Sequence, residues 1–220
     1  MCQGWGQRRV CQACVTRFAA PQPRCTHCAL RVPQGVAVCG ACTVDPPPFD
    51  RALAAVDYAH PWDGLVTRFK FHAALDLAPA LAQRLFAATQ EAKMPVPALL
   101  IPVPLSDARL RERGYNQSWE LAKLLGKMLH CRADAGLLLR VKDTPHQADL
   151  PLDRRAANVR AAFAVDPRRV GELRGQAVTL VDDVMTTGAT AAEIAEVLKR
   201  SGASRVHVWA VARTPHPGEL

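Results

Sequence analysis

Two adjacent carboxylates, Asp182 and Asp183, stand where an apolar segment gives way to small hydroxyl residues. The preceding residues, 178–181, are rich in β-branched and apolar types, which predicts a buried strand that delivers both carboxylates to a sheet edge. Apolar spacing over 191–200 predicts a helix after the hydroxyl run. A turn at a helix N-terminus offers N–H groups and hydroxyls to an anion, and Gly188 permits close backbone approach or a positive φ. This combination suits a sugar phosphate.

The stretch from Val178 to Thr190 resembles the signature of type I phosphoribosyltransferases, which bind phosphoribosyl pyrophosphate (PRPP). The resemblance implies that Asp182 and Asp183 are the catalytic candidates, which fix the ribose hydroxyls and assist Mg²⁺. It also implies a cradle for the 5′-phosphate, formed by Met185, Thr186, Thr187, Gly188, Ala189 and Thr190. The alternative is an ordinary strand–turn–helix with a capping box from Thr190 and Glu193. That alternative does not require two aspartates side by side.

Cysteine spacing indicates a metal site. Seven of the eight cysteines lie in the first 42 residues, and in a cytosolic chain such clustering favours metal over disulfide. Three complete Cys-x-x-Cys pairs, each separated by ten residues, are Cys11/Cys14, Cys25/Cys28 and Cys39/Cys42. Two such pairs can close a tetrahedral zinc site without an open position, so we expect structural zinc and no zinc catalysis. The segment 1–45 has too few large apolar residues to fold alone, and metal binding would supply the missing free energy.

The run from Cys2 to Trp5 reads as a fourth pair whose second cysteine has become tryptophan. Sequential pairing then predicts one complete zinc site, formed by Cys25, Cys28, Cys39 and Cys42. It leaves a degenerate second site, formed by Cys2, Cys11 and Cys14. The spacing fits equally well a site formed by Cys11, Cys14, Cys25 and Cys28. Redox-active or buried free thiols are the remaining alternative.

A second group of basic residues follows an apolar strand expected at 99–104. Arginines at 109, 111 and 113 lead into a Gly-Tyr-Asn-Gln string and a helix expected at 116–130. Because ligands of parallel sheets bind beyond the carboxyl ends of strands, this segment could face the 178–190 loop and hold the pyrophosphate. The tentative pyrophosphate candidates are Arg111, Arg113, Gly114 and Asn116. Alternatively, the arginines form a solvated charge run and Asn116 caps the helix.

Four motifs together resemble the ComF family of phosphoribosyltransferase-like proteins, which are tied to DNA uptake in naturally transformable bacteria. They are the Cys-x-x-Cys ribbon, Pro-Val-Pro-Leu at 102–105, Arg-x-Arg-Gly-Tyr-Asn-Gln at 111–117 and Val-Asp-Asp-Val-x-Thr-Thr-Gly-Ala-Thr at 181–190. The resemblance covers essentially the whole chain and implies a double zinc ribbon, from which Trp5 departs. It also implies a flexible hood over PRPP at 140–163, with closing residues Lys142, Gln147, Arg155 and Asn158. The alternative for this segment is a solvated surface loop.

Composition limits the classes of protein. The 220 residues are 49% hydrophobic with a net charge of +8, which suits a soluble globular protein that binds phosphate-bearing ligands or nucleic acid. Arginine-rich composition can also follow genome bias. No apolar run approaches the roughly 20 residues that span a bilayer, and the N-terminus lacks the apolar core of a signal peptide, so we expect a cytoplasmic protein.

The elements that must position these groups alternate between strands and helices from residue 51 onward. Strands are expected at 51–58, 99–104, 137–141, 178–181 and 205–212, with the last one closing the sheet. Helices are expected after a cap at Asp63 and at 77–92, 116–130 and 191–200. This alternation predicts an α/β fold, a mainly parallel sheet flanked by helices, which the resemblance makes type I phosphoribosyltransferase-like. The expected units are a Cys-rich ribbon at 1–45, a proline linker at 46–50 and a phosphoribosyltransferase-like domain at 51–220.

The leading functional hypothesis is a PRPP-binding phosphoribosyltransferase-type protein that supports DNA uptake. In a catalytic member, pyrophosphate would leave C1 of the ribose while a nucleophile attacks the opposite face, and no residue stands out as a general base. One alternative is a non-enzymatic PRPP or nucleotide sensor that docks on DNA-uptake proteins. Another is a protein that binds single-stranded DNA through the ribbon and the basic loops. The sequence leaves the acceptor substrate, catalytic competence and oligomeric state open.

Overall fold

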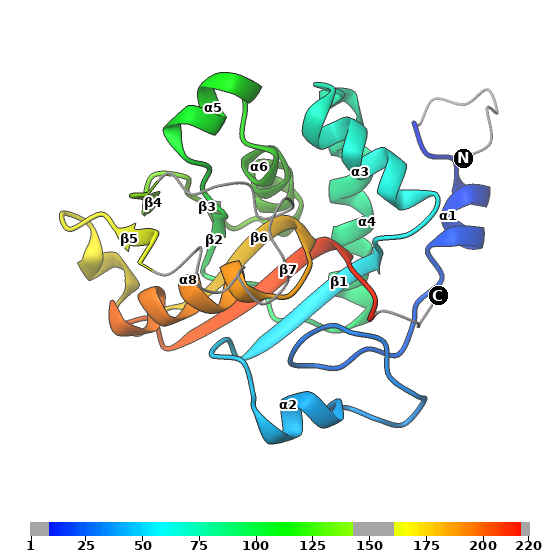
Figure 1. Cartoon of the computed structure of the whole chain (residues 1–220), viewed down its shortest axis with the longest axis horizontal. Helices are drawn as coiled ribbons and strands as arrows, with labels where there is room; N and C mark the ends of the chain where they lie inside the picture. Colours follow the sequence, from blue (N-terminus) through cyan, green and yellow to red (C-terminus); the bar gives the residue numbers. More distant parts are fainter. Residues whose placement is uncertain (1–8, 143–160, 217–220) are drawn as a thin grey trace.

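A parallel sheet forms the centre of the computed structural model, which describes residues 9–142 and 161–216 (Figure 1). The strand order is β1-β7-β6-β2-β3, and all neighbours run parallel. The strands span Arg51–Asp57 (β1), Leu99–Pro102 (β2), Arg132–Ala133 (β3), Ala177–Met185 (β6) and Arg205–Arg213 (β7). A separate antiparallel pair consists of Leu138–Arg140 (β4) and Phe163–Val165 (β5).

Strand β6 occupies the middle of the sheet because its sequence suits burial on both faces. Residues 178–181 are buried, and Val181 lies opposite Trp209 of β7 and Pro102 of β2. The amide of Val103 still donates to the carbonyl of Val181 at 3.0 Å after β2 has ended. The strand therefore carries its last residues to the carboxyl edge of the sheet, beside the chain that leaves β2.

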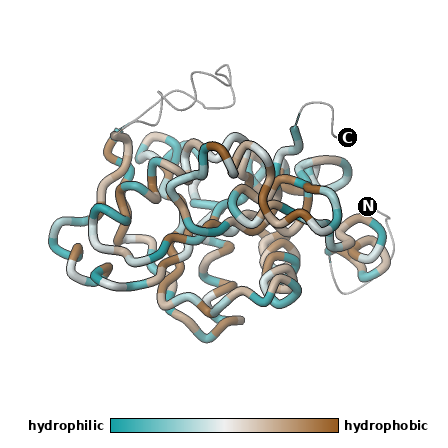
Figure 2. The backbone as a smooth tube through the Cα atoms, turned by 90° about the horizontal axis from the view of Figure 1, so that it is seen from below, coloured by the Kyte–Doolittle hydropathy of each residue, from teal (hydrophilic) through white to brown (hydrophobic). Residues whose placement is uncertain are grey.

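Helices cover both faces of the sheet. One face packs against α8 (Ala189–Arg200), and the other against α3 (Trp62–Phe71), α4 (Ala78–Glu91) and α6 (Gln117–Leu129). Successive strand residues alternate between the two cores, as Val208 and Trp209 do in β7. Figure 2 shows the hydropathy along the backbone, in which apolar and polar stretches alternate.

The remaining elements are short. They are α1 (Gln12–Phe18), α2 (Gly40–Val44), α5 (Asp107–Arg113) and the 3₁₀ turns Leu75–Leu77 (η1) and Val170–Leu173 (η4). Among the residues described, no helix has both the length and the apolar character needed to cross a membrane.

The structure confirms the α/β class and corrects four details. Strand β7 lies between β1 and β6, so β1 and not β7 forms that edge of the sheet. The strand at 138–140 pairs with β5 outside the main sheet. Asp63 lies inside α3, whose N-cap is Pro61, and accepts a hydrogen bond from Gly64 at 2.7 Å. The basic segment after β2 is a helix, α5, which the sequence pattern does not reveal because none of its residues is buried.

The N-terminal segment contacts the sheet domain at several places. Val10, just before α1, and Cys14 within it belong to the same buried cluster as Phe69 of α3. Further along, the carbonyl of Thr26 accepts a hydrogen bond from the amide of Ala52 at 2.9 Å, on the edge strand β1. The domain boundary expected at 46–50 stays a prediction.

Candidate functional site

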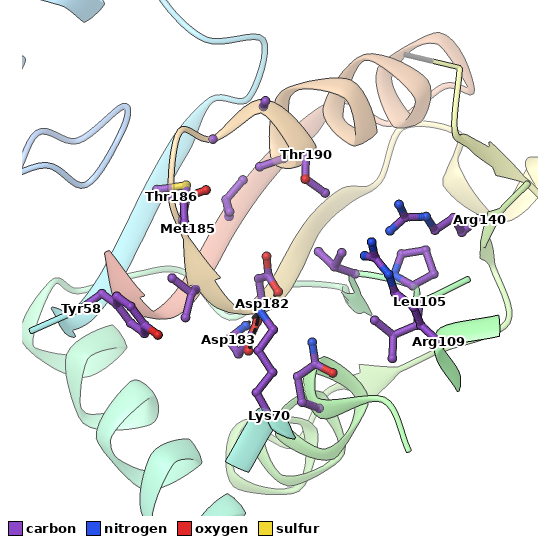
Figure 3. A pocket seen from close by; sticks show the side chains of 18 of the residues that line it. Tyr58, Lys70, Leu105, Arg109, Arg140, Asp182, Asp183, Met185, Thr186 and Thr190 are labelled. Atoms are coloured by element: carbon purple, nitrogen blue, oxygen red, sulfur yellow. Dashed lines mark hydrogen bonds and ion pairs between the residues drawn. The ribbon is translucent and has the colours of Figure 1, made fainter. Parts of the chain in front are cut away.

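A cavity of about 280 Å³ opens at the carboxyl edge of the central strands (Figure 3). Seven separate stretches of chain line it: the residue after β1, the end of α3, the segment from β2 into α5, the start of α6, Arg140, the turn from β6 into α8, and Val208 of β7. The acidic side chains come from β6, and the cationic ones come from the elements around that strand. The cationic residues that line the cavity are Lys70, Arg109, Arg113 and Arg140. The site therefore combines two carboxylates with cations from several elements.

The turn from β6 into α8 forms one wall of the cavity. Gly188 is the N-cap of α8 and has a φ of +84°, in the left-handed region that favours glycine. Its carbonyl accepts from Ala192 at 2.8 Å, which starts the helix, while the hydroxyl of Thr187 accepts from the Ala189 amide at 3.3 Å. The first N–H groups of any helix lack partners within it, so this end of α8 suits an anion. Of the six loop residues predicted, all but Thr187 line the cavity.

Asp183 is buried and forms an ion pair with Lys70. The Lys70 ammonium lies 3.2 Å from Oδ2 of Asp183 and 3.4 Å from Oδ1. Burial works to raise the pKa of Asp183, but the charge of Lys70 and hydrogen bonds from Asp182 and Lys70 hold that pKa below its ordinary value. Asp183 therefore stays ionised inside the fold.

Asp182 is half-buried and lies beside the first turn of α6. Its Oδ1 accepts hydrogen bonds from the Ser118 hydroxyl at 3.1 Å and from the Asp183 amide at 2.9 Å. Burial and the neighbouring charge of Asp183 both raise the pKa of Asp182. The Lys70 ammonium pairs with Asp183 and acts on Asp182 only through its charge, an arrangement that favours hydroxyl donors or a cation as a further partner of Asp182.

Helix α5 selects which arginines face the cavity. Arg109 and Arg113 are one helical turn apart, are half-buried and line it, whereas Arg111 lies on the exposed side. Arg113 donates to Oε1 of Gln117 at 2.5 Å, and its guanidinium lies 5.2 Å from the ring centroid of Phe71. Without the expectation of a helix here, the sequence does not indicate which of the three arginines share a face, so it could not predict which of them line the cavity.

The Gly-Tyr-Asn-Gln string, 114–117, forms hydrogen bonds to two of the elements that line the cavity. Gly114 ends α5 with a φ of +79°. The hydroxyl of Tyr115 donates to the carbonyl of Phe69, next to Lys70. Asn116 caps α6 by accepting from Ser118 and Trp119 at 2.9 and 3.2 Å, and its amide donates to the carbonyl of Val103 at 3.0 Å. Gly114 and Asn116 do not line the cavity, so their part in pyrophosphate binding stays a prediction.

Several lining residues were missed by sequence reasoning. Lys70 and Phe71 end α3, Tyr58 follows β1, and Arg140 ends β4. None carries a local motif, because each reaches the cavity only through the tertiary arrangement. Of the predicted hood residues, Lys142 ends the described segment, and its carbonyl accepts from Arg140 at 3.2 Å. The other three, Gln147, Arg155 and Asn158, lie outside the described residues.

Away from the cavity, Cys25, Cys28, Cys39 and Cys42 form one cluster whose Sγ atoms all lie within 4.8 Å of one another. The amide of Cys39 donates to the Sγ of Cys25 at 3.3 Å. This is the set expected from sequential pairing. Cys11 caps α1 and Cys14 belongs to that helix; both lie outside the cluster, so the structure does not assemble the alternative set. Cys2 lies outside the described residues.

The shifted pKa values of the cluster thiols favour a bound cation. Burial opposes ionisation of Cys25, but amide hydrogen bonds, the strongest from Cys39, lower its pKa to about 7. Burial raises the pKa of Cys28 to about 11 and also raises that of Cys42. Crowded thiols cannot all ionise without a compensating charge, and a tetrahedral divalent ion supplies it. The cluster could hold a metal such as zinc.

Comparison with known proteins identifies the family. The phosphoribosyl transferase domain family matches residues 73–220. The DNA utilization protein YhgH of Escherichia coli (strain K12) is 34% identical over 214 residues, which cover 96% of this chain and 91% of that protein. Competence protein F of Haemophilus influenzae is 33% identical over 207 residues, which cover 92% and 88%.

The chain belongs to the ComF family. This confirms the resemblance drawn from the motifs and the type I phosphoribosyltransferase-like fold of this ComF-family protein. Among solved structures, the purine phosphoribosyltransferase from Pyrococcus horikoshii Ot3 aligns with a TM-score of 0.36 and 19% identity, over 61% of this chain and 70% of that one. The family assignment rests on the sequence match and not on that partial superposition.

Proposed function

We propose that this ComF-family protein binds PRPP with Mg²⁺ in the cavity at the carboxyl edge of the sheet. One observation carries the proposal: the cavity joins adjacent carboxylates, the N-terminal turn of α8 and several cations. A phosphorylated sugar with a pyrophosphate presents the complementary groups, namely hydroxyls, one monophosphate and one diphosphate. The relatives named for DNA utilization and competence support a role in DNA uptake. We propose that the protein acts in the cytoplasm.

Each group on the ligand has a counterpart on the chain. The turn at 186–190 binds the 5′-phosphate through N–H groups and hydroxyls. Asp182 and Asp183 accept hydrogen bonds from the ribose hydroxyls, and Lys70 keeps Asp183 ionised for that purpose. The cations from α5 and β4 face the pyrophosphate. The two aspartates would help to hold Mg²⁺ with PRPP, and the ion would supply charge neutralisation of the pyrophosphate leaving group.

Transfer of the phosphoribosyl group is the reaction that this site would support. The aspartates would also balance positive charge that develops on the ribose as pyrophosphate departs. Among the described lining residues there is no histidine, and the two aspartates are already assigned to the ribose and the metal. The acceptor would therefore bring its own nucleophilic nitrogen or be activated by the departing pyrophosphate.

We also propose that a structural zinc ion binds the cluster of Cys25, Cys28, Cys39 and Cys42. Four thiolates close the coordination sphere and leave no site for a water nucleophile. The ion would fix the segment that lies along the edge of β1.

The direct test is calorimetric titration of the purified protein with PRPP and Mg²⁺. Arg113→Gln, which changes a cavity residue, should weaken binding about tenfold, in line with a lost charge-assisted hydrogen bond. Arg111→Gln is the matched control, because it removes the same charge from the exposed side of the same helix. Equal losses in both variants would indicate a nonspecific charge effect and count against the cavity.

A second candidate, binding of single-stranded DNA, is favoured by a shallow groove on α6. Trp119, Lys123, Lys127 and His130 line it, and the Lys123 ammonium lies 5.7 Å from the Trp119 ring centroid. Stacking on an aromatic ring beside cations is a common way to hold a single strand. Binding of an oligonucleotide that weakens steeply with salt and is reduced by Trp119→Ala would support this role, whereas unchanged binding in that variant would exclude the groove.

A further inference from the structure

Arg213, the last residue of β7, joins the metal cluster to the phosphate turn. Its side chain is buried, with 5% of its surface exposed. Nε donates to the carbonyl of Cys28 at 2.9 Å. Nη1, with two hydrogens, is shared among three carbonyl acceptors, those of Met185 at 3.1 Å, Thr214 at 2.9 Å and Thr186. One guanidinium thus holds the backbone of a cluster cysteine and the backbone of the turn that faces the cavity.

These contacts orient the peptide groups of the turn. In a trans peptide the N–H points opposite to the C=O, so a carbonyl held by Arg213 directs the next N–H away from Arg213. The carbonyl of Met185 is also held by the amide of Thr214, at 3.1 Å, as an extension of the strand pairing. For the carbonyl of Thr186, Arg213 is the hydrogen-bond donor found in the described part of the chain. The peptide between Thr186, which lines the cavity, and Thr187 is therefore the part of the turn whose direction depends most on Arg213.

The other end of the bridge depends on the cluster. Cys28 contributes its Sγ to the four-cysteine set, so a bound ion would fix the backbone whose carbonyl receives Arg213. The same segment docks a second time through Asp57, which pairs with Arg24 at 2.9 Å and with Arg31. Asp57 lies opposite Arg213 in the register of β1 and β7. This second contact holds the segment but does not touch the phosphate turn.

We propose that Arg213 is a positioning residue that couples occupancy of the four-cysteine site to phosphate binding at the 186–190 turn. Metal binding fixes the Cys28 carbonyl, Arg213 transmits that order to the Thr186 peptide, and the ordered turn accepts phosphate. Because coupling between two sites is reciprocal, phosphate bound in the turn strengthens retention of the metal by the same factor. The inference rests on the proposed binding of PRPP and adds a regulatory role for the ribbon.

The test measures zinc transfer from the full-length zinc-loaded protein to a colorimetric chelator. Saturating PRPP with Mg²⁺ should slow zinc release about fivefold or more, within the usual range of coupling between sites. Ribose 5-phosphate, which carries only the phosphate of the turn, should slow it too, whereas inorganic pyrophosphate should have a smaller effect. Zinc release from an unrelated four-cysteine protein under the same additions corrects for zinc bound by the ligands themselves.

Two variants separate coupling from simple loosening. Arg213→Lys keeps the charge but cannot bridge both backbones, so the protection by PRPP should disappear and PRPP affinity should fall about fivefold. Arg31→Gln weakens the Asp57 contact alone, so zinc release should quicken while the protection factor stays the same. If Arg213→Lys does not fold, the wild-type arm still decides, since unchanged zinc release with bound PRPP overturns the proposal.

Failure of the coupling and failure of PRPP binding give different results. Calorimetry that detects PRPP binding, together with zinc release that PRPP does not slow, overturns only the coupling. Absence of any PRPP binding by the wild-type protein overturns the proposed function and the coupling with it.

Discussion

The Lys70–Asp183 ion pair predicts a stability that depends on pH in a definite direction. Asp183 is 2% exposed, Lys70 is 28% exposed, and Nζ lies 3.2 Å from Oδ2. Two unit charges at that distance attract by about 5 kcal/mol at an effective dielectric constant of about 20. Desolvation of both groups offsets more than half of that attraction. We therefore expect Lys70→Met to lower the free energy of unfolding by about 2 kcal/mol near pH 8.

The sign of the pH dependence follows from the pKa of Asp183. In the wild type it lies below the ordinary value, because Lys70 and the hydrogen bonds override burial. That contribution to stability is present above the ordinary carboxyl pKa of about 4 and is lost as pH falls through the lowered pKa. In Lys70→Met, burial raises the pKa of Asp183, and only the hydrogen bonds from Asp182 and the Val184 amide remain to oppose it. The variant then gains a proton on folding, so its deficit shrinks as pH falls from about 8 to about 5.

Urea unfolding followed by tryptophan fluorescence, repeated across this pH range, measures the deficit. Lys70→Arg is the matched control, because it retains the charge, and it should stay within about 1 kcal/mol of the wild type. A deficit of the same size at both ends of the range would refute the electrostatic reasoning. So would a Lys70→Met variant as stable as the wild type near pH 8.

The other predictions concern the metal, the core and the phosphate turn. Elemental analysis should find about one zinc per chain, and Cys39→Ser should lose it while Cys11→Ser retains it; protein purified without chelator that lacks zinc would contradict this. Gly126→Ala should cost about 1–3 kcal/mol in chemical unfolding, because its Cβ would lie 2.9 Å from the Cys131 carbonyl oxygen, whereas Gly64→Ala meets nothing within 4 Å and should be nearly neutral. Gly188→Val should weaken PRPP binding at least about tenfold through strain at φ +84°, and Gly188→Asn, which tolerates that region, should lose less. Wild-type affinity in the Gly188→Val variant would remove the turn from the site.

The sequence was informative where function lies in one continuous stretch. The strand, carboxylates, turn and helix at 178–200 are contiguous, so residue types alone predict the place and chemistry of the turn. Sequential pairing likewise predicts the observed cysteine cluster, although the spacing alone fits the set of Cys11, Cys14, Cys25 and Cys28 equally well. In both places the local pattern and the tertiary structure agree.

Prediction failed where a residue acts through distant partners. Lys70 meets Asp183 across 113 positions of sequence, and Arg213 meets Cys28 across 185. No periodicity or motif encodes such meetings, since they arise when separate strands bring their carboxyl ends together. Helix α5 was missed for another reason: it buries no apolar face, and its caps, Ser106 and Gly114, carry the signal instead.

Binding of PRPP is the central claim, and calorimetric titration of the wild type beside Asp182→Asn/Asp183→Asn tests it most directly. The account predicts saturable binding to the wild type that requires Mg²⁺, and a loss of at least about a hundredfold in the double variant, which removes both carboxylates from the ribose and the metal. Retained zinc and cooperative unfolding would show that the variant is folded. Equal affinity in the two proteins, or absence of binding by the wild type, would contradict the account.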